Sequence, residues 1–144
     1  MLIQKLSNRR KVYGANIPDV VKELCAKPVF AHLATLTKDG SPQVTPVWID
    51  FDGSLIWINT AKDRIKDQNM RRDKRVAISI LDPDNAYRHV AIRGEVAEIT
   101  ENGADAHIDA MAKKYLGKDR YPFRSPSEVR VIYKIRPVKV ATMG

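Results

Sequence analysis

This sequence contains one cysteine and no closely spaced histidines. Cys25 is its single cysteine, so an intrachain disulfide and a cluster of thiolate metal ligands are both excluded. The three histidines, His32, His89 and His107, lie far apart, and neither an HExxH motif nor another paired-ligand spacing is present. We therefore expect no metal site.

The motifs of several enzyme classes are also missing. There is no GxSxG element, no Cys/His pair in a suitable local context, and no Walker or dinucleotide-binding glycine motif. Gly94, within Arg93-Gly94-Glu95, is interpreted as a strand bend and not as a phosphate loop. Because no side-chain nucleophile is evident, a bound cofactor has to carry the chemistry while the protein orients it.

Long apolar runs are absent as well. The segment Met1-Leu2-Ile3-Gln4-Lys5 lacks the apolar stretch of a signal peptide, and no later run is long enough to span a bilayer. These features predict a cytoplasmic protein with no membrane partner. A chain of 144 residues fits one domain. We expect that domain to cover residues 16–144, after a basic N-terminal arm at residues 1–15 that contains Arg9-Arg10-Lys11.

Positive charge is what the sequence has in excess. Its 25 Lys and Arg residues outnumber 17 Asp and Glu residues, which gives a formal net charge of +8 at pH 7. Such a field attracts anions, and nucleic acids, phosphorylated cofactors and acidic tails are all candidates. A domain of this size has little room for a deep, enclosed site. We therefore expect a small ligand to lie in a groove or between two copies of the chain.

Six short apolar runs separated by turn signals predict β-strands. Asp39-Gly40 and Asp52-Gly53 are expected to turn two successive hairpins, because glycine tolerates a positive φ. Few helical segments interrupt the runs, which favours a mainly β fold, a six-stranded antiparallel barrel, over a βαβ fold. The predicted strands are 30–36, 43–51, 55–59, 76–81, 90–99 and 129–135, with 138–141 extending the last one after a break at Pro137.

Three helices are predicted around these strands. Asn16 can cap the first, and Pro18 suits its first turn because the missing N–H would be unpaired there. The second, at residues 63–72, is rich in charged residues. The third, at residues 104–116, is amphipathic, and Gly117 supplies its C-terminal stop.

The first candidate site lies where the strand that ends at Thr60 meets the helix that begins near Asp63. Backbone N–H groups at a helix start bind anions, and the Thr60 hydroxyl and the side chains of Arg64 and Lys66 would add charge-assisted bonds. Acidic residues are usual in a first helical turn. The two basic residues therefore fit this place best if an external anion binds there. The alternative is a charged, solvated helix that covers one end of the barrel.

Two strands offer further candidates. Pro46 removes a hydrogen-bond donor, which predicts an edge strand or a bulge whose free backbone groups could bind the polar edge of a flat heterocycle. Trp48, in the same run, has ordinary core packing as its alternative role. In the last strand, Arg130, Lys134 and Arg136 alternate with apolar residues. The basic face that results is either solvated or suited to an acidic cofactor tail.

At these residues the sequence resembles the pyridoxamine 5'-phosphate oxidase-like split-barrel family, and more closely its branch of coenzyme F-420-dependent enzymes. The Arg-x-Lys-x-x-Asn element of Arg64, Lys66 and Asn69 follows the Asp-Gly-x-Pro element of residues 39–42, and this combination is fairly specific. The resemblance extends from Pro18 to Met143. Its matching stretches are 30–36, 39–48, 59–60, 64–69, 72–73, 92–96 and 114–119.

The resemblance implies a split β-barrel of the FMN-binding type, present as a homodimer with two cofactor sites at the subunit interface. Carried over to this sequence, it assigns the cofactor phosphate to Thr60, Arg64 and Lys66. Asn59 and Asn69 would support them.

The resemblance also implies roles for three other segments. Tyr87 and Arg88 resemble positions that the second subunit brings toward the site. The region of Arg130 resembles the one that contacts the oligoglutamate tail of coenzyme F-420. The isoalloxazine ring would lie along the backbone of Val44, Thr45, Pro46, Val47 and Trp48.

The cofactor and the reaction follow from the resemblance together with the charge. FMN and coenzyme F-420 both carry a ribityl phosphate on a tricyclic ring, and the surplus of positive charge favours F-420, whose tail is polyanionic; FMN is the alternative. We expect hydride transfer between coenzyme F-420 and a small organic substrate, with the proton donor left open between solvent and a nearby Tyr or Arg.

Other functions are compatible with the same features. One is an FMN-dependent oxidase or reductase, and another is a carrier that binds the cofactor without turnover. A nucleic-acid-binding barrel is a more distant alternative, because the few aromatic residues form no stacking platform interleaved with basic ones. We expect no nucleic-acid partner.

Overall fold

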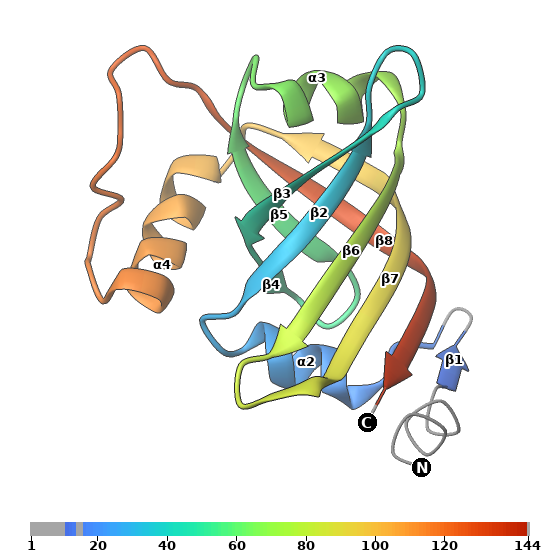
Figure 1. The fold of residues 1–144 in the computed structure, drawn as a ribbon. Coiled ribbons are helices and arrows are strands. Elements are labelled where there is room, and N and C mark those ends of the chain that lie inside the picture. Colours follow the sequence, from blue (N-terminus) through green and yellow to red (C-terminus); the bar gives the residue numbers. More distant parts are fainter. Residues whose placement is uncertain (1–10, 14–15, 144) are drawn as a thin grey trace.

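The strands form one curled antiparallel sheet in the computed structural model, which describes residues 11–13 and 16–143, of 11–13 only the backbone (Figure 1). Their order in the sheet is β3-β2-β6-β7-β8-β5-β4, with β1 paired to β8. The mainly β, antiparallel fold that we predicted is confirmed. The strands are β1 (Lys11–Tyr13), β2 (Phe30–Leu36), β3 (Pro42–Trp48), β4 (Asp50–Phe51), β5 (Ile56–Ala61), β6 (Arg75–Asp82), β7 (Asn85–Thr100) and β8 (Arg130–Met143).

The described residues form eight strands in place of the six predicted: β1 was not predicted, β7 begins at Asn85 and not at residue 90, and two of the other runs differ as follows. The predicted run 43–51 is divided at Ile49, because the chain leaves one edge of the sheet there and joins the other. Gly40 and Gly53 turn their hairpins with φ of 87° and 100°. Both predicted hairpins are present, but the one at Gly53 joins β4 to β5 while the one at Gly40 joins β2 to β3, so the predicted meander, in which the two hairpins share a strand, is wrong.

The last strand does not break at Pro137, since β8 continues through it opposite Gly94. The register shifts between Arg93 and Gly94, which confirms the predicted strand bend and gives the proline a bulge in which to sit. A Cβ on Gly94 would lie 2.7 Å from Ile135 Cγ2 and 3.0 Å from the carbonyl oxygen of Arg136. Only glycine fits this approach of the two strands.

The predicted N-terminal arm is described only in part. The backbone of Lys11–Tyr13 pairs as β1 with the end of β8. Arg9 and Arg10 lie outside the described residues.

Three helices in the described residues cover the sheet: α2 (Asp19–Cys25), α3 (Ile65–Arg72) and α4 (Ala104–Leu116). Figure 1 shows α3 and α2 at opposite ends of the curled sheet and α4 at its side. The predicted bounds of α4 and its stop at Gly117, with φ of 70°, are confirmed. The predicted cap at Asn16 is wrong, because Pro18 is the N-cap of α2. None of these helices is long and apolar enough to cross a membrane.

The core lies inside the curl of the sheet. Every second residue of β6 is buried, so Val76, Ile78 and Ile80 point inward while their neighbours face outward. From the facing strands, Ile58 of β5 and Tyr133 of β8 are fully buried in the same cluster. Residues far apart in the sequence therefore share one apolar interior, which holds the sheet in its curled form.

The crossing at Ile49 is bound by the C-terminal turn of α4. The backbone N–H of Ile49 donates to the Tyr115 hydroxyl over 2.9 Å, and that hydroxyl donates to the carbonyl of Val29 over 2.5 Å. The ammonium group of Lys114 donates to the carbonyl of Ile49 over 2.7 Å and also to the carbonyl of Cys25. These bonds tie Ile49 to the main chain at the end of α2 and before β2, and they pair main-chain groups that lie outside the strands.

Tyr115→Phe tests this role of the hydroxyl. We expect the substitution to lower the free energy of unfolding by about 1–3 kcal/mol, because it leaves the Ile49 N–H and the Val29 carbonyl without their partner. Denaturant unfolding would measure the loss. Tyr121→Phe is the matched control, since the Tyr121 hydroxyl has no hydrogen bond among the described residues, and an equal loss in both variants would contradict the role.

Candidate functional site

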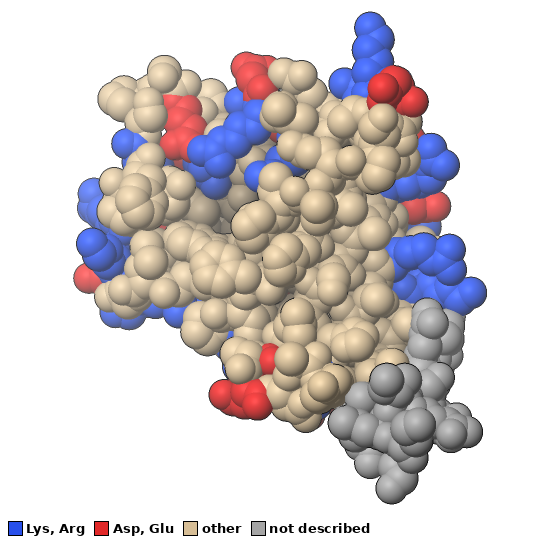
Figure 2. All heavy atoms as spheres, in the orientation of Figure 1, with Lys and Arg blue, Asp and Glu red and all other residues tan. Residues whose placement is uncertain are grey.

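A hollow of about 180 Å³ lies where β3, β5, α3 and α4 meet. Its lining includes a cationic cluster, which we define as Arg64, Lys66 and Arg130, beside the hydroxyl-bearing Thr60. Figure 2 shows Lys and Arg atoms gathered beside a hollow on this face of the molecule. The cluster combines the start of α3 with the start of β8, so the fold joins two segments that are 64 residues apart in their closest pair, Lys66 and Arg130.

Arg64 and Lys66 owe their place to the turn that leads from β5 into α3. Arg64 is the N-cap of the helix, and Asp63 before it adopts a left-handed conformation with φ of 74°. The N–H of Asp63 donates to the buried carboxylate of Asp67 over 2.9 Å. A side-chain carboxylate one turn into the helix thus holds the backbone in the conformation that presents the two basic residues.

Lys66 is the cation of the cluster without an ion-pair partner in the described part of the chain. It is half-buried, and this burial lowers the pKa of its ammonium group. The positive charges of Arg64 and Arg130 lower that pKa further. Three cations that repel one another at a partly desolvated place favour the binding of an anion.

The hydroxyl of Thr60 is a second polar group at the hollow. Thr60 is 2% exposed and lines the hollow, and its Oγ1 has no hydrogen-bond partner among the described residues. A buried hydroxyl left in this state costs about 1–3 kcal/mol. An oxygen-rich anion bound to the cationic cluster would supply the partner.

An aromatic cluster, which we define as Phe30, Trp48, Tyr121 and Phe123, also lines the hollow. The Tyr121 ring meets Trp48 edge-on at 6.1 Å and Phe123 at 5.6 Å. Phe30 and Phe123 remain 58% and 67% exposed. Apolar rings exposed beside a cationic cluster suit a flat ligand that carries an anionic group.

Comparison with known proteins identifies the family. The family model for pyridoxamine 5'-phosphate oxidase matches residues 17–144. The chain belongs to this family. A solved structure named F420 reductase is 32% identical, with a TM-score of 0.75 over 86% of this chain and 98% of its own. The resemblance seen in the sequence and the predicted split-barrel fold are thereby confirmed.

Two more distant structures show the same fold and are compared for the fold alone. A conserved hypothetical protein from Mycobacterium tuberculosis is 23% identical, with a TM-score of 0.69, and the match covers 90% of this chain and 86% of its own. An FAD-binding protein from Mesorhizobium loti is 17% identical, with a TM-score of 0.65, and the match covers 94% of this chain and 98% of its own.

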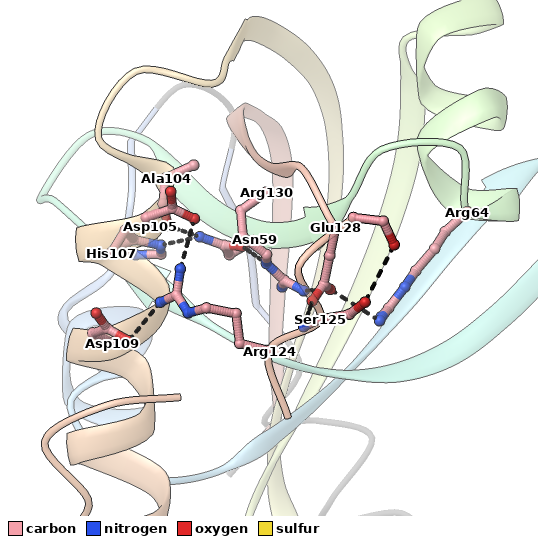
Figure 3. A network of polar contacts seen from close by, with 11 residues as sticks. Asn59, Arg64, Ala104, Asp105, His107, Asp109, Arg124, Ser125, Glu128 and Arg130 are labelled. Carbon is pink, nitrogen blue, oxygen red and sulfur yellow. Dashed lines mark hydrogen bonds and ion pairs between the residues drawn. The ribbon is translucent and has the colours of Figure 1, made fainter. Parts of the chain in front are cut away.

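In this member of the pyridoxamine 5'-phosphate oxidase family, Arg130 is held by a chain of polar contacts (Figure 3). Its Nε donates to Asn59 Oδ1 over 2.9 Å, and its Nη1 donates to the carboxylate of Glu128. The guanidinium group also lies over the ring of Tyr121, 5.1 Å from its centroid. Arg130 is 5% exposed, so these contacts fix a nearly buried cation at the wall of the hollow.

The contact between Asn59 and Arg130 also determines which ring nitrogen of His107 carries the proton. Arginine can only donate, so the oxygen of the Asn59 amide faces Arg130 and its NH2 group faces away. That NH2 group donates to the carbonyl of Ala104 over 2.9 Å and contacts His107 Nδ1 at 3.1 Å. Nδ1 is therefore the acceptor, and the ring carries its proton on Nε2, 3.0 Å from Asp50 Oδ2.

Asp50 anchors the far end of this chain of contacts. Burial by itself would raise the pKa of its carboxyl group, but the hydrogen bonds from His107 and from the N–H of Phe51 outweigh burial and hold the pKa below its ordinary value. An ionised Asp50 thus orients His107, which orients Asn59, which orients Arg130. Asp50 and His107 position the site without lining the hollow.

Eight of the predicted cofactor residues meet in the hollow, namely Pro46, Val47, Trp48, Asn59, Thr60, Arg64, Lys66 and Arg130. Pro46 lies in β3, an edge strand as its sequence predicted. Val44 lines a different hollow, on the outer face of the sheet. Thr45 lies in the same strand, and its Oγ1 is buried without a hydrogen-bond partner in the part of the chain that the structure describes.

The other predicted residues lie away from the hollow. Asn69 is buried and donates to Thr35 Oγ1 over 3.0 Å, which ties α3 to β2. Arg88 pairs with Asp82 at 3.0 Å and with Glu23 at 2.5 Å, beside α2 at the opposite end of the sheet from α3 (Figure 1). Tyr87 precedes Arg88 in β7 and is 58% exposed.

The basic face predicted for the last strand is largely neutralised, which corrects the sequence interpretation. Lys134 pairs with Glu98 at 2.9 Å and Arg136 with Glu95 at 3.0 Å. Arg130 is buried because the loop before β8 covers it. The alternation in β8 could not reveal acidic partners that come from β7 and from that loop.

Glu128, His107, Asp50 and the rings of Tyr121 and Phe123 were not singled out from the sequence as site residues. Each comes from a segment whose position depends on long-range packing. The single available signal was that Glu128 stands two positions before Arg130, a spacing common to many surface ion pairs.

Thr60→Val tests whether the hydroxyl lacks a partner. We expect this nearly isosteric change to raise the free energy of unfolding of the ligand-free protein by about 1 kcal/mol, because it removes an unpaired buried hydroxyl. Chemical denaturation would measure the gain. Thr35→Val is the matched control, since that 1% exposed hydroxyl bonds to Asn69, and its loss should destabilise the protein. Destabilisation by both changes would contradict the assignment.

Proposed function

We propose that this protein is an oxidoreductase that binds coenzyme F-420 and transfers a hydride between the cofactor and a small organic substrate. FMN is the alternative cofactor. The observation that carries the proposal is the buried hydroxyl of Thr60 beside the cationic cluster, a hydroxyl that has no partner within the described residues 16–143. A ribityl phosphate would supply both the acceptor oxygen and the negative charge. The solved F420 reductase, at 32% identity, supports the choice of cofactor.

The residues of the hollow fit such a cofactor. The phosphate would be held by Thr60, Arg64 and Lys66, and the flat ring would lie along the free edge of β3 next to Trp48. The bound ring supplies the hydride donor or acceptor. The chain's own part is to bind and orient the cofactor and, through the aromatic cluster, to exclude water from one side of it.

The proposal includes a second copy of the chain. A hollow of about 180 Å³ is smaller than the roughly 300–1,000 Å³ usual for sites that enclose a small molecule. The outer face of the sheet carries two adjoining hollows of about 480 and 440 Å³ over alanines such as Ala34 and Ala77, and Val44 beside them is 62% exposed. A homodimer would cover this face and bring Tyr87 and Arg88 of the partner toward the cofactor.

Arg64→Ala and Lys66→Ala test the phosphate assignment. We expect each change to weaken binding of coenzyme F-420 and FMN about tenfold to a hundredfold, because each removes a charge-assisted hydrogen bond. Titration of the purified protein, followed by cofactor fluorescence, would measure the dissociation constants. Lys62→Ala is the matched control, since Lys62 pairs with Glu101 at 3.8 Å and does not line the hollow.

The same titration separates the alternatives. Tight binding of FMN in preference to F-420 would favour the FMN-dependent enzyme, and binding without turnover of any substrate would favour the carrier. Unchanged binding in both the Arg64 and the Lys66 variants would contradict the phosphate site. Binding of DNA or RNA that falls steeply with salt, without affinity for either cofactor, would contradict the oxidoreductase altogether.

A further inference from the structure

Glu128 contacts the same two arginines that line the hollow. Its Oε1 accepts from Arg130 and lies 3.4 Å from Arg64 Nη2. Its Oε2 accepts from the N–H of Ser125, 3.4 Å away, and the N–H of Glu128 donates to the carbonyl of Ser125 over 3.0 Å. Figure 3 shows the carboxylate lying between the two guanidinium groups. The side chain of Glu128 is only 9% exposed.

We propose that Glu128 is an internal counter-ion that competes with the anionic group of the ligand for Arg64 and Arg130. The inference rests on the proposed function, because the competing group is the cofactor phosphate. With the hollow empty, the carboxylate neutralises one of the three positive charges of the cationic cluster. A bound phosphate would pair with Arg64 in place of Glu128. The negative charge of Glu128 would then repel the phosphate across the cluster.

The alternative is that Glu128 positions the arginines for the ligand, and the contacts argue against it. Arg130 is already fixed without Glu128, by the oxygen of Asn59 and by the ring of Tyr121. The contact to Arg64 is long, and the Arg64 side chain is 52% exposed, so that pair contributes little to holding Arg64 in place. An ionised carboxylate and a fully ionised phosphate ester both lack a donor, so the two groups repel each other.

Glu128 also has a structural role when no ligand is bound. Arg130 is nearly buried, and a buried cation without a partner destabilises a fold strongly. Glu128 supplies that partner. The same carboxylate therefore stabilises the ligand-free protein and weakens its affinity for an anion, two effects with opposite signs.

Glu128→Gln separates these two effects, because it removes the charge and keeps the shape. We expect the ligand-free variant to melt at a lower temperature than the wild type. We also expect it to bind FMN and coenzyme F-420 about tenfold more tightly, since a repulsive charge next to the phosphate is gone. Inorganic phosphate should raise the melting temperature of the variant more than that of the wild type. Fluorescence titration and thermal melting would measure these changes.

Glu101→Gln is the matched control. It changes the net charge equally, but Glu101 belongs to a half-exposed surface pair with Lys62 and lines none of the hollows described above. The affinity of this variant for the cofactors should stay within about twofold of the wild type, because exposed pairs are screened. An equal gain in affinity from Glu101→Gln would attribute the effect to overall charge and overturn the proposal.

The remaining outcomes are also decisive. If Glu128→Gln lowers stability and does not tighten the binding of the cofactor, Glu128 is a positioning residue and the proposal fails. The proposed function would still stand in that case, provided that Lys66→Ala weakens cofactor binding in the otherwise wild-type protein. If neither the wild type nor Glu128→Gln binds a cofactor or phosphate, the proposed function and this inference fail together.

Discussion

At Ile49 the main chain crosses from one edge of the sheet to the other. The hydroxyl of Tyr115 and the ammonium group of Lys114 bind the main chain at this crossing. Through this crossing β3 lies at one edge and β4 and β5 at the other, and the hollow opens between them. Trp48, the residue before the crossing, stacks on the ring of Tyr115 with centroids 4.9 Å apart and planes 8° apart. The bonds that hold the fold at this point therefore also hold one wall of the candidate site.

The site itself combines stable packing with unsatisfied groups. Asp50, His107 and Asn59 are fully engaged in hydrogen bonds and orient Arg130. The buried hydroxyl of Thr60, by contrast, has no hydrogen-bond partner in the described part of the chain, and the half-buried ammonium group of Lys66 forms no ion pair there. A half-buried cation and an unpaired buried hydroxyl beside a rigid, satisfied network suit the binding of an anion.

The sequence allowed good predictions where the determining interactions are local. The turn glycines Gly40 and Gly53, the stop of α4 at Gly117 and the basic pair that opens α3 all depend on neighbouring residues, and each lies where it was expected. The family resemblance then joined the basic pair to β3 and Arg130, which chain spacing alone could not do.

Interactions between distant segments were beyond prediction. Nothing near Ile49 indicates that the chain changes sheet edges there, since the bonds that fix it come from α4, more than sixty residues later. For the same reason Glu128 and the acidic partners of Lys134 and Arg136 were missed, and β8 was expected to present a freely basic face. Charge patterns along one strand say little about which charges a neighbouring strand supplies.

The central claim is that an anionic group of the cofactor binds between the start of α3 and the hydroxyl of Thr60. A crystal structure of the protein with coenzyme F-420 or FMN would test it most directly. The account predicts a phosphate oxygen within hydrogen-bond distance of Thr60 Oγ1, with Arg64 and Lys66 on the other phosphate oxygens. A cofactor whose phosphate lies elsewhere, with the Thr60 hydroxyl still unpaired, would contradict it.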